Sequence, residues 1–142
     1  MIRAILDTNV VVQSVISSPP AASARVLDAY YSRRFRFVYS PSTLDELIDV
    51  LLLPPIRARH GLSDDEVLEF AASLLVSADR YDAVEAVPAS LTRDITDSKF
   101  LDLAEASDAD YLVTNDRRHL LGLKRHHRTE IITPAEFLRR LA

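Results

Sequence analysis

The sequence predicts an α/β fold in which a mainly parallel sheet is covered by helices on both faces. Short runs of nearly continuous apolar residues alternate with stretches of helical periodicity, which is the pattern of parallel strands buried between helices. The 142 residues are 48% hydrophobic and include no cysteine, so the core must hold together without disulfides. No repeat or linker divides the chain, and we expect residues 1–142 to form a single domain.

The first 40 residues contain two expected strands and one expected helix. The first strand covers residues 2–6 and ends at Asp7-Thr8-Asn9, whose side chains begin a turn or cap a helix. We interpret residues 1–16 as a core strand that leads into a functional loop, because the apolar run is too short for a membrane span and lacks a signal cleavage site. Apolar spacing then predicts a helix over 22–32, and residues 36–39 predict the second strand.

Three later helices carry start signals. Ser40-Pro41 opens a helix whose leucines share one face, and we expect Pro54-Pro55 to end it. Ser63 and Glu66 form a capping-box pattern ahead of a helix that runs to about residue 77. Thr133-Pro134 supplies the cap and the first-turn proline of a last helix.

The remaining elements surround a polar stretch. Residues 80–87 are ambiguous between a loop and a short strand. The elements that follow are a helix from Asp97, a strand at 111–114, a polar stretch that starts at Asn115-Asp116 and a strand at 130–132. In sheets of this kind ligands bind beyond the carboxyl ends of the strands.

The charge distribution limits how the protein can bind nucleic acid. The formal net charge of −4 argues against binding by bulk attraction alone, but two bound divalent cations would add four positive charges and bring the total to zero. Lys99 and Lys124 are the only lysines, so most of the basic residues are Arg. The planar guanidinium group of Arg is well suited to binding phosphate groups. A coding preference for Arg explains this bias equally well.

Four acidic residues fall where this architecture would place a site. Asp7 ends the first strand and Asp116 follows the strand at 111–114, so both belong at the same edge of the sheet. Glu46 lies early in the helix after the second strand, outside its apolar face, and Asp97 starts a later helix. Carboxylates that converge repel each other unless cations or protons intervene. Oxygen ligands favour Mg²⁺ or Mn²⁺.

Each acid also has a purely structural explanation. Asp7 and Asp97, taken alone, are more often helix caps than ligands. Glu46 is compatible with an exposed helix position, and Asp116 is compatible with a turn. Spacing alone leaves these alternatives open.

Four segments of the chain carry a familiar combination of motifs. They are, in order, IRAILDTNVVVQSVIS at the start, SPSTLDELIDVL at 40–51, RDITDSKFLDLAEASDADYLVTND at 93–116 and TEIITPAEFL at 129–138. Together they resemble the PIN-domain family, and most closely its branch of toxins from toxin-antitoxin pairs, the relatives of VapC-like ribonucleases. The resemblance covers nearly the whole chain, and its specificity lies in the combination, not in any single motif.

The resemblance implies a three-layer α/β/α sandwich, similar to flavodoxin or Rossmann folds, and gives the acids roles. The family's catalytic and metal-binding acids correspond to Asp7, Glu46, Asp97 and Asp116. The residues that would support them by hydrogen bonds are Asn9, Thr114 and Asn115. This branch often has further acids directly beside Asp97, whereas this chain has Thr96 and Ser98 there. Asp94 either fills that role or is a loop residue.

The activity that the resemblance implies is a Mg²⁺- or Mn²⁺-dependent endoribonuclease with an RNA substrate, acting in the cytoplasm as a toxin beside a cognate antitoxin. Such a site needs no side-chain nucleophile, because two cations activate water and neutralise the leaving oxygen. The apolar faces of the helices at 44–52 and 67–75 form a dimer face, receive an antitoxin peptide or simply belong to the core. Residues 124–128 are expected to form a surface loop, which is either solvated or in contact with RNA phosphates.

Two other classes of protein share parts of this pattern. A catalytically silent PIN-like module would bind RNA or a partner protein without cutting, and the presence of all four acids counts against it. A phospho-acceptor domain also gathers acids around Mg²⁺, but it normally has a lysine at a late strand end where this chain has Thr114-Asn115.

Overall fold

A six-stranded sheet runs through the part of the chain that the computed structural model describes, which is residues 1–18, 20–82 and 95–142, the side chains of 95–97 excepted. The strand order is β3-β2-β1-β4-β6-β5. The strands are β1 (Arg3–Leu6), β2 (Arg36–Tyr39), β3 (Asp79–Arg80), β4 (Tyr111–Val113), β5 (Arg125–His126) and β6 (Thr129–Ile132). All pairs are parallel except the hairpin of β5 and β6, which confirms the mainly parallel sheet.

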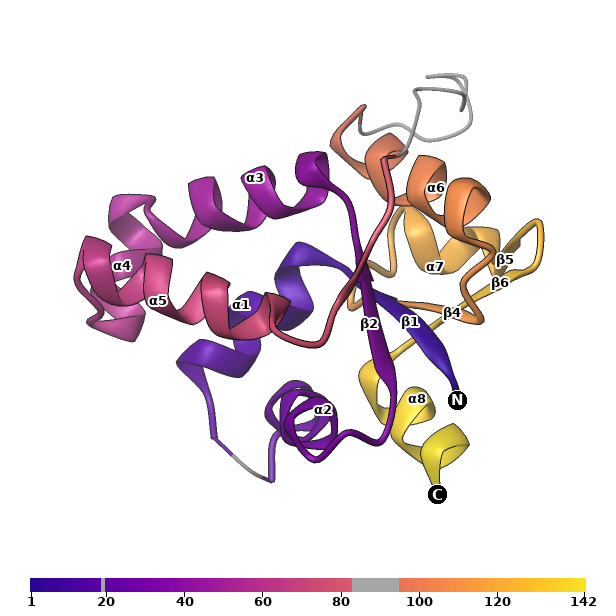
Figure 1. The fold of residues 1–142 in the computed structure, drawn as a ribbon, viewed down its shortest axis with the longest axis horizontal. Coiled ribbons are helices and arrows are strands. Elements are labelled where there is room, and N and C mark those ends of the chain that lie inside the picture. Colours follow the sequence, from indigo (N-terminus) through magenta and orange to yellow (C-terminus); the bar gives the residue numbers. More distant parts are fainter. Residues whose placement is uncertain (19, 83–94) are drawn as a thin grey trace.

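Helices cover both faces of this sheet (Figure 1). They are α1 (Thr8–Ile16), α2 (Ala22–Tyr31), α3 (Pro41–Leu51), α4 (Pro54–His60), α5 (Asp64–Leu75), α6 (Ile95–Ser107), α7 (Leu120–Leu123) and α8 (Pro134–Leu141). Their side chains, together with those of the strands, divide into two buried clusters. One cluster holds residues of α1, α2, α3, α5 and α8, and the other holds residues of α6 and α7. The three-layer sandwich is thereby confirmed.

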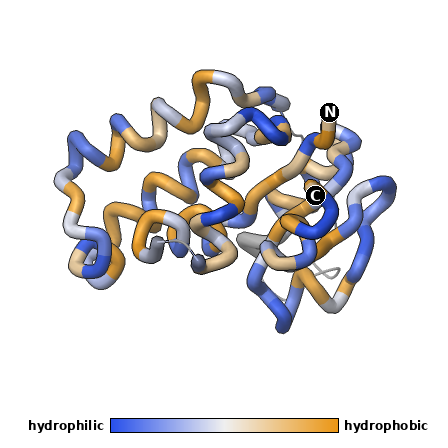
Figure 2. The backbone as a smooth tube through the Cα atoms, turned by 90° about the horizontal axis from the view of Figure 1, so that it is seen from below, coloured by the Kyte–Doolittle hydropathy of each residue, from blue (hydrophilic) through white to orange (hydrophobic). Residues whose placement is uncertain are grey.

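The central strand β1 shows why the layers separate so cleanly. Its side chains alternate, so that Ala4 and Leu6 enter the cluster under α1 and α2 while Ile5 enters the cluster under α6. All three are at most 4% exposed. Figure 2 shows the corresponding pattern along the helices, where hydrophobic and hydrophilic stretches alternate. Burial of a large aliphatic side chain such as Leu6 or Ile5 stabilises the fold by about 1.5–3 kcal/mol. β1 therefore contributes to both buried clusters.

Three helices begin where the sequence predicts. The Ser40 and Ser63 hydroxyls accept hydrogen bonds from the third residue of α3 and α5 respectively. In return, the Ser40 and Ser63 backbone N–H groups donate to the side chains of Thr43 and Glu66. The Thr133 side chain accepts from the Glu136 N–H at 3.2 Å, and Pro134 occupies the first turn of α8. These caps satisfy backbone N–H groups that have no partner inside the helix.

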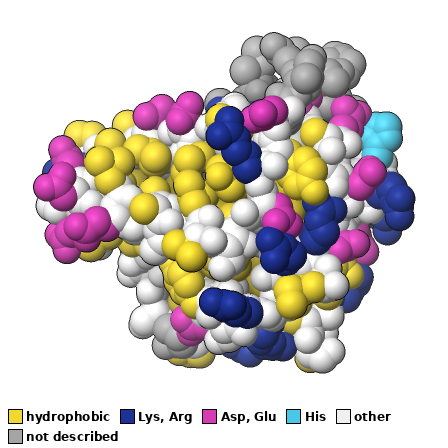
Figure 3. Space-filling model, in the orientation of Figure 1, with side chains coloured by type: hydrophobic (Ala, Val, Ile, Leu, Met, Phe, Trp, Pro, Cys, Tyr) yellow, Lys and Arg dark blue, Asp and Glu magenta, His cyan; other side chains and the backbone are white. Residues whose placement is uncertain are grey.

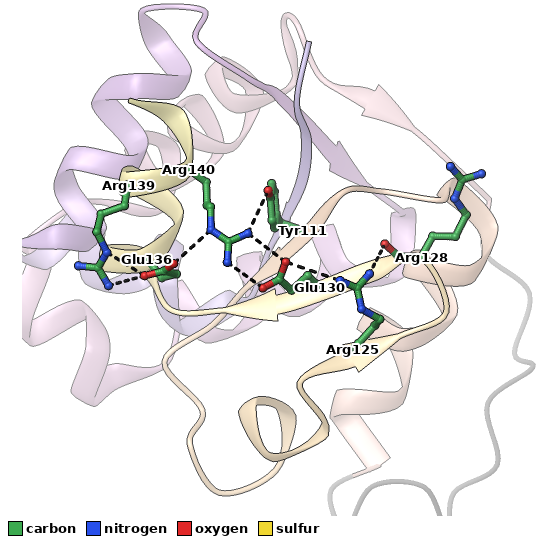
Figure 4. A network of polar contacts seen from close by, with 7 residues as sticks. All are labelled: Tyr111, Arg125, Arg128, Glu130, Glu136, Arg139 and Arg140. Atoms are coloured by element: carbon green, nitrogen blue, oxygen red, sulfur yellow. Dashed lines mark hydrogen bonds and ion pairs between the residues drawn. The ribbon is translucent and has the colours of Figure 1, made fainter.

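The last helix is held to the sheet by an apolar contact and by a polar network. Phe137 is fully buried and packs edge-on against Phe35, with ring centroids 4.9 Å apart. On the outer side, Arg140 donates to both oxygens of Glu130 at 3.0 Å and also reaches Glu136 (Figure 4). Because this network is partly exposed, most of the docking energy comes from the aromatic contact.

Four elements differ from the sequence-based expectations. Residues 8–16 form α1 where we expected a loop, because burial of its consecutive valines against the sheet outweighs their low helix propensity. Pro54-Pro55 starts α4 as well as following α3, since proline suits the first turn of a helix. The short helix α7 has no expected counterpart. The expected loop at 124–128 contains β5 and the turn of a hairpin.

The ambiguous segment at 80–87 is only partly described. Residues 79–80 form β3, which pairs with β2, and residues 83–87 lie outside the described residues. Within the described ranges, no helix is both long enough and apolar enough to cross a membrane.

Candidate active site

The site lies at the point where the strand order reverses. β1 is flanked by β2 on one side and by β4 on the other, so the connections from these strands leave in opposite directions along the sheet. Asp7 directly follows β1, and its backbone N–H donates to the Val113 carbonyl of β4 at 2.9 Å. Asp116 comes three residues after β4 ends. Such a switch point at the carboxyl ends of parallel strands is where open α/β sheets bind ligands.

Asp7 is a buried carboxylate, with 5% of its surface exposed. It occupies the N-cap position of α1, yet its side chain makes no capping hydrogen bond to that helix in the described structure. Instead its Oδ2 accepts from the Thr114 hydroxyl at 2.6 Å and from Asn9 Nδ2 at 3.1 Å. The capping explanation for Asp7 therefore does not account for its carboxylate.

The pKa of Asp7 is raised to about 6, and burial is the main cause. The hydrogen bonds from the Thr114 hydroxyl and the Thr8 N–H lower the pKa, the first more than the second. The negative charges of Glu46 and, to a smaller extent, Asp116 raise it further. Glu46 and Asp116 are thus each close enough to repel the carboxylate of Asp7. A cation placed among them would reverse the balance and favour the ionised form of Asp7.

Asn9, Thr114 and Asn115 connect the two strand ends. Asn9 Oδ1 accepts from the Asn115 N–H at 3.3 Å, while its amide donates to Asp7. The Thr114 hydroxyl, which is fully buried, donates to Asp7 and accepts from the Asp116 N–H at 2.9 Å. A single threonine therefore fixes the carboxylate of one acid and the backbone of another.

Asp116 is partly exposed and also stabilises the turn that follows it. Its Oδ1 accepts from the backbone N–H groups of Arg118 at 3.1 Å and His119 at 3.0 Å. The turn role considered from the sequence is therefore present. It coexists with the electrostatic proximity of Asp116 to Asp7.

Glu46 approaches the site from α3. The Thr8 hydroxyl donates to its Oε2, and Lys99 Nζ of α6 lies 3.4 Å from its Oε1. The Glu46 side chain is only 16% exposed, which rules out the exposed-helix explanation. Sequence reasoning did not assign roles to Thr8 and Lys99. Both stand next to motif acids, in Asp7-Thr8-Asn9 and in Asp97-Ser98-Lys99, and that adjacency was the available signal.

Asp97 and Asp94 are less completely placed. Asp97 is the third residue of α6, and its side chain is not among those described. Asp94 lies outside the described residues. Ser98 Oγ, next to Asp97, is buried and has no hydrogen-bond partner within the described part of the chain. The structure thus brings together Asp7, Glu46 and Asp116 and places the backbone of Asp97 on the helix that carries Lys99.

The donor set fits a hard divalent cation. Asp7, Glu46 and Asp116 offer carboxylate oxygens, which Mg²⁺ and Mn²⁺ prefer. The Asn9 amide and the Thr114 hydroxyl both donate to Oδ2 of Asp7, and ligating carboxylates in proteins are commonly oriented by such hydrogen bonds. The charge of Lys99 already compensates part of the negative charge at Glu46.

Comparison with known proteins agrees with this architecture. A sequence profile of the PIN domain matches residues 3–118, and no curated protein sequence matches the chain. Among solved structures, a chain of VapBC2 from Rickettsia felis, crystallised bound to a DNA fragment from its promoter, superposes with a TM-score of 0.60 at 15% identity, covering 93% of this chain and 98% of that one. PAE2754 from Pyrobaculum aerophilum gives a TM-score of 0.56 at 18% identity, with coverage of 99% and 89%.

The fold and the acids at the switch point define an α/β protein of the PIN type. The chain belongs to the PIN-domain family. Its likeness to the two solved structures is a likeness of fold, because the sequence identities are low.

Proposed function

We propose that this protein is a metal-dependent ribonuclease that hydrolyses RNA phosphodiester bonds. The observation that carries the proposal is the convergence of Asp7, Glu46 and Asp116 at the carboxyl ends of β1 and β4, where burial, and to a smaller extent the charges of the other two acids, raises the pKa of Asp7. Membership of the PIN-domain family supports the same reaction.

Mg²⁺ or Mn²⁺ bound to these acids would lower the pKa of an attacking water and neutralise the charge that develops on the departing oxygen. The protein's contribution is to hold the ligands in place. Thr114 and Asn9 fix the Asp7 carboxylate, and Thr8 fixes Glu46. Thr114 directly follows β4, and Thr8 and Asn9 lie in the first turn of α1. The positions of the proposed ligands are therefore fixed by regular secondary structure.

Asp97 is proposed as the fourth acid. It lies in the first turn of α6, two residues before Lys99. The Lys99 side chain forms an ion pair with Glu46 of α3. That ion pair brings the start of α6 next to the helix that carries Glu46. The family motif places a metal-binding acid at this position, and the path of α6 is compatible with that role.

We further propose that the ribonuclease is the toxin of a type II toxin-antitoxin pair and acts in the cytoplasm. The superposition on a chain of VapBC2 supports this role at the level of fold. An antitoxin, or a second copy of this chain, would need an apolar surface to bind. Leu53 and Leu68 are about half exposed beside α4 and α5, and hydrophobic side chains gather over α3 and α5 in Figure 3.

Cleavage of RNA by the purified protein tests the proposal. We expect cleavage with Mg²⁺ or Mn²⁺, none with EDTA, and none from Asp7→Asn with either metal. Asp45→Asn is the matched control, because Asp45 is the exposed neighbour of Glu46 on α3, and it should cleave like the wild type. Full cleavage by Asp7→Asn would overturn the mechanism. RNA binding without any cleavage by the wild type would favour the silent binding module.

A further inference from the structure

A second group of ligating side chains lies at the other end of α6. Glu105 belongs to the last turns of α6, and His126 and His127 belong to the β5–β6 hairpin that packs beside it (Figure 1). Glu105 Oε1 is 3.1 Å from His126 Nε2 and 2.6 Å from His127 Nε2. One ligand atom from each residue lies within 4.8 Å of the other two.

We propose that Glu105, His126 and His127 bind one Zn²⁺ ion, at a site separate from the acidic one. Two imidazole nitrogens and a carboxylate oxygen are a ligand set that suits Zn²⁺ and is unlike the all-oxygen sets of Mg²⁺. Three protein ligands leave the fourth tetrahedral position to water. The site therefore has the chemistry of an open zinc site.

The spacing of the ligand atoms fits this ion. Bonds of about 2.0–2.1 Å in a tetrahedron place the ligand atoms about 3.3 Å apart. The two contacts to Glu105, 3.1 and 2.6 Å, are about 0.2 and 0.7 Å shorter. Binding of the ion would therefore require the His127 and Glu105 side chains to move apart.

The turn conformation of His127 helps to form the cluster. His127 and Arg128 form the two-residue turn of the hairpin, and His127 has φ 53°, in the left-handed region. Glycine or asparagine is the usual choice at such turn positions. A strained backbone persists where the surroundings fix it, and such residues cluster at ligand sites. Here the conformation places the imidazole beside Glu105 and perpendicular to the ring of His126.

The surroundings allow a cation to enter. The His126 side chain is 12% exposed, while that of His127 is 61% exposed and opens the site to solvent. Arg125, on the same hairpin, is directed to Glu130 and to the Arg128 carbonyl (Figure 4). Figure 3 shows histidine and acidic side chains reaching the surface together. The negative charge of Glu105 thus faces the site with little local competition.

Calorimetric titration with Zn²⁺ tests the proposal on protein prepared without a histidine tag and with excess Mg²⁺ to fill the acidic site. We expect one Zn²⁺ per chain, and a thermal midpoint that rises with Zn²⁺ but not with further Mg²⁺. Asp7→Asn should bind Zn²⁺ as the wild type does. That result would separate the zinc site from the proposed nuclease site.

Single substitutions assign the ligands. Glu105→Gln and His126→Gln should weaken Zn²⁺ binding by more than about tenfold. His127→Gly should do the same while folding normally, because glycine adopts φ 53° without strain. Arg128→Gln, in the same turn, is the control and should bind like the wild type. No binding by the wild type, or unchanged binding by His127→Gly, would overturn the site and leave an ordinary Glu-His ion pair.

Discussion

Asp7 combines burial with a raised pKa, and this predicts how stability depends on pH. The folded-state pKa of about 6 lies above the ordinary value of 3.8, so the folded protein holds the proton more tightly than the unfolded chain. The contribution of Asp7 to stability is therefore fully present below about pH 4 and is lost as the pH rises through 6. A shift of about two units corresponds to roughly 3 kcal/mol at most.

Asp7→Asn should remove this penalty. In EDTA at about pH 8 we expect the variant to be more stable than the wild type by roughly 1–3 kcal/mol, and at about pH 4 we expect the advantage to vanish. Urea unfolding at both pH values measures this. Adding Mg²⁺ should stabilise the wild type more than the variant, because Asp7→Asn removes one of the proposed carboxylate ligands. A variant less stable than the wild type at both pH values would contradict the prediction.

Thr114 is predicted to orient the site without touching the substrate. Thr114→Val keeps the side-chain shape but removes the hydroxyl that joins Asp7 and Asp116. We expect Mg²⁺ affinity and RNA cleavage to fall by about 10–100-fold. Thr114→Ser should restore most of both, because it restores the hydroxyl. Equal losses in the valine and serine variants would point to packing and not to the hydrogen bonds.

The sequence located the site residues that follow strands and was less informative about their partners. Asp7 and Asp116 were found because parallel strands place their carboxyl ends at one edge. The pairing of Glu46 with Thr8 and Lys99 depends on how α3 and α6 pack, which no local pattern encodes. Glu105 and His126 are 21 residues apart and meet only through the hairpin. For that reason the residues of the proposed zinc site were read as parts of a helix and a loop.

At the scale of elements, the capping box of α5 is predicted to stabilise the fold measurably. Ser63→Ala removes the acceptor for the Glu66 N–H and should lower the free energy of unfolding by about 1 kcal/mol. Glu69→Gln is a suitable control, because Glu69 is exposed on the same helix. Chemical denaturation of both variants gives the comparison. A loss in the control as large as that in Ser63→Ala would mean that helix charge, and not the cap, is responsible.

Elements with strong terminal signals were predicted well, and those governed by packing were not. α3, α5 and α8 each begin at a Ser or Thr cap, which is a local interaction written in the sequence. α1 contains three consecutive valines, Val10 to Val12, and valine favours strands unless tertiary contacts decide otherwise. α7 has four residues, too few to show a helical period. The turn between β5 and β6 uses His127 where glycine is the recognisable signal.

For the whole molecule, the net charge predicts that RNA binding depends on divalent cations. The chain carries a formal charge of −4, so phosphate contacts must overcome general repulsion. With Ca²⁺ as a hard cation in place of Mg²⁺, we expect the affinity for a short RNA to be at least tenfold higher than in EDTA. Electrophoretic mobility shifts measure this. Asp7→Asn should show a much smaller dependence on the cation, whereas binding that ignores Ca²⁺ would place the RNA away from the acids.

The backbone N–H of Asp7 takes part in the hydrogen bonding between strands, since it donates to the Val113 carbonyl of β4. Asp7 is therefore held more firmly in place than a loop residue. To displace it, β1 and β4 must part, and opening of central strands ranks among the rarest fluctuations of a native protein. The Asp7 end of the proposed site should therefore persist for as long as the folded state does.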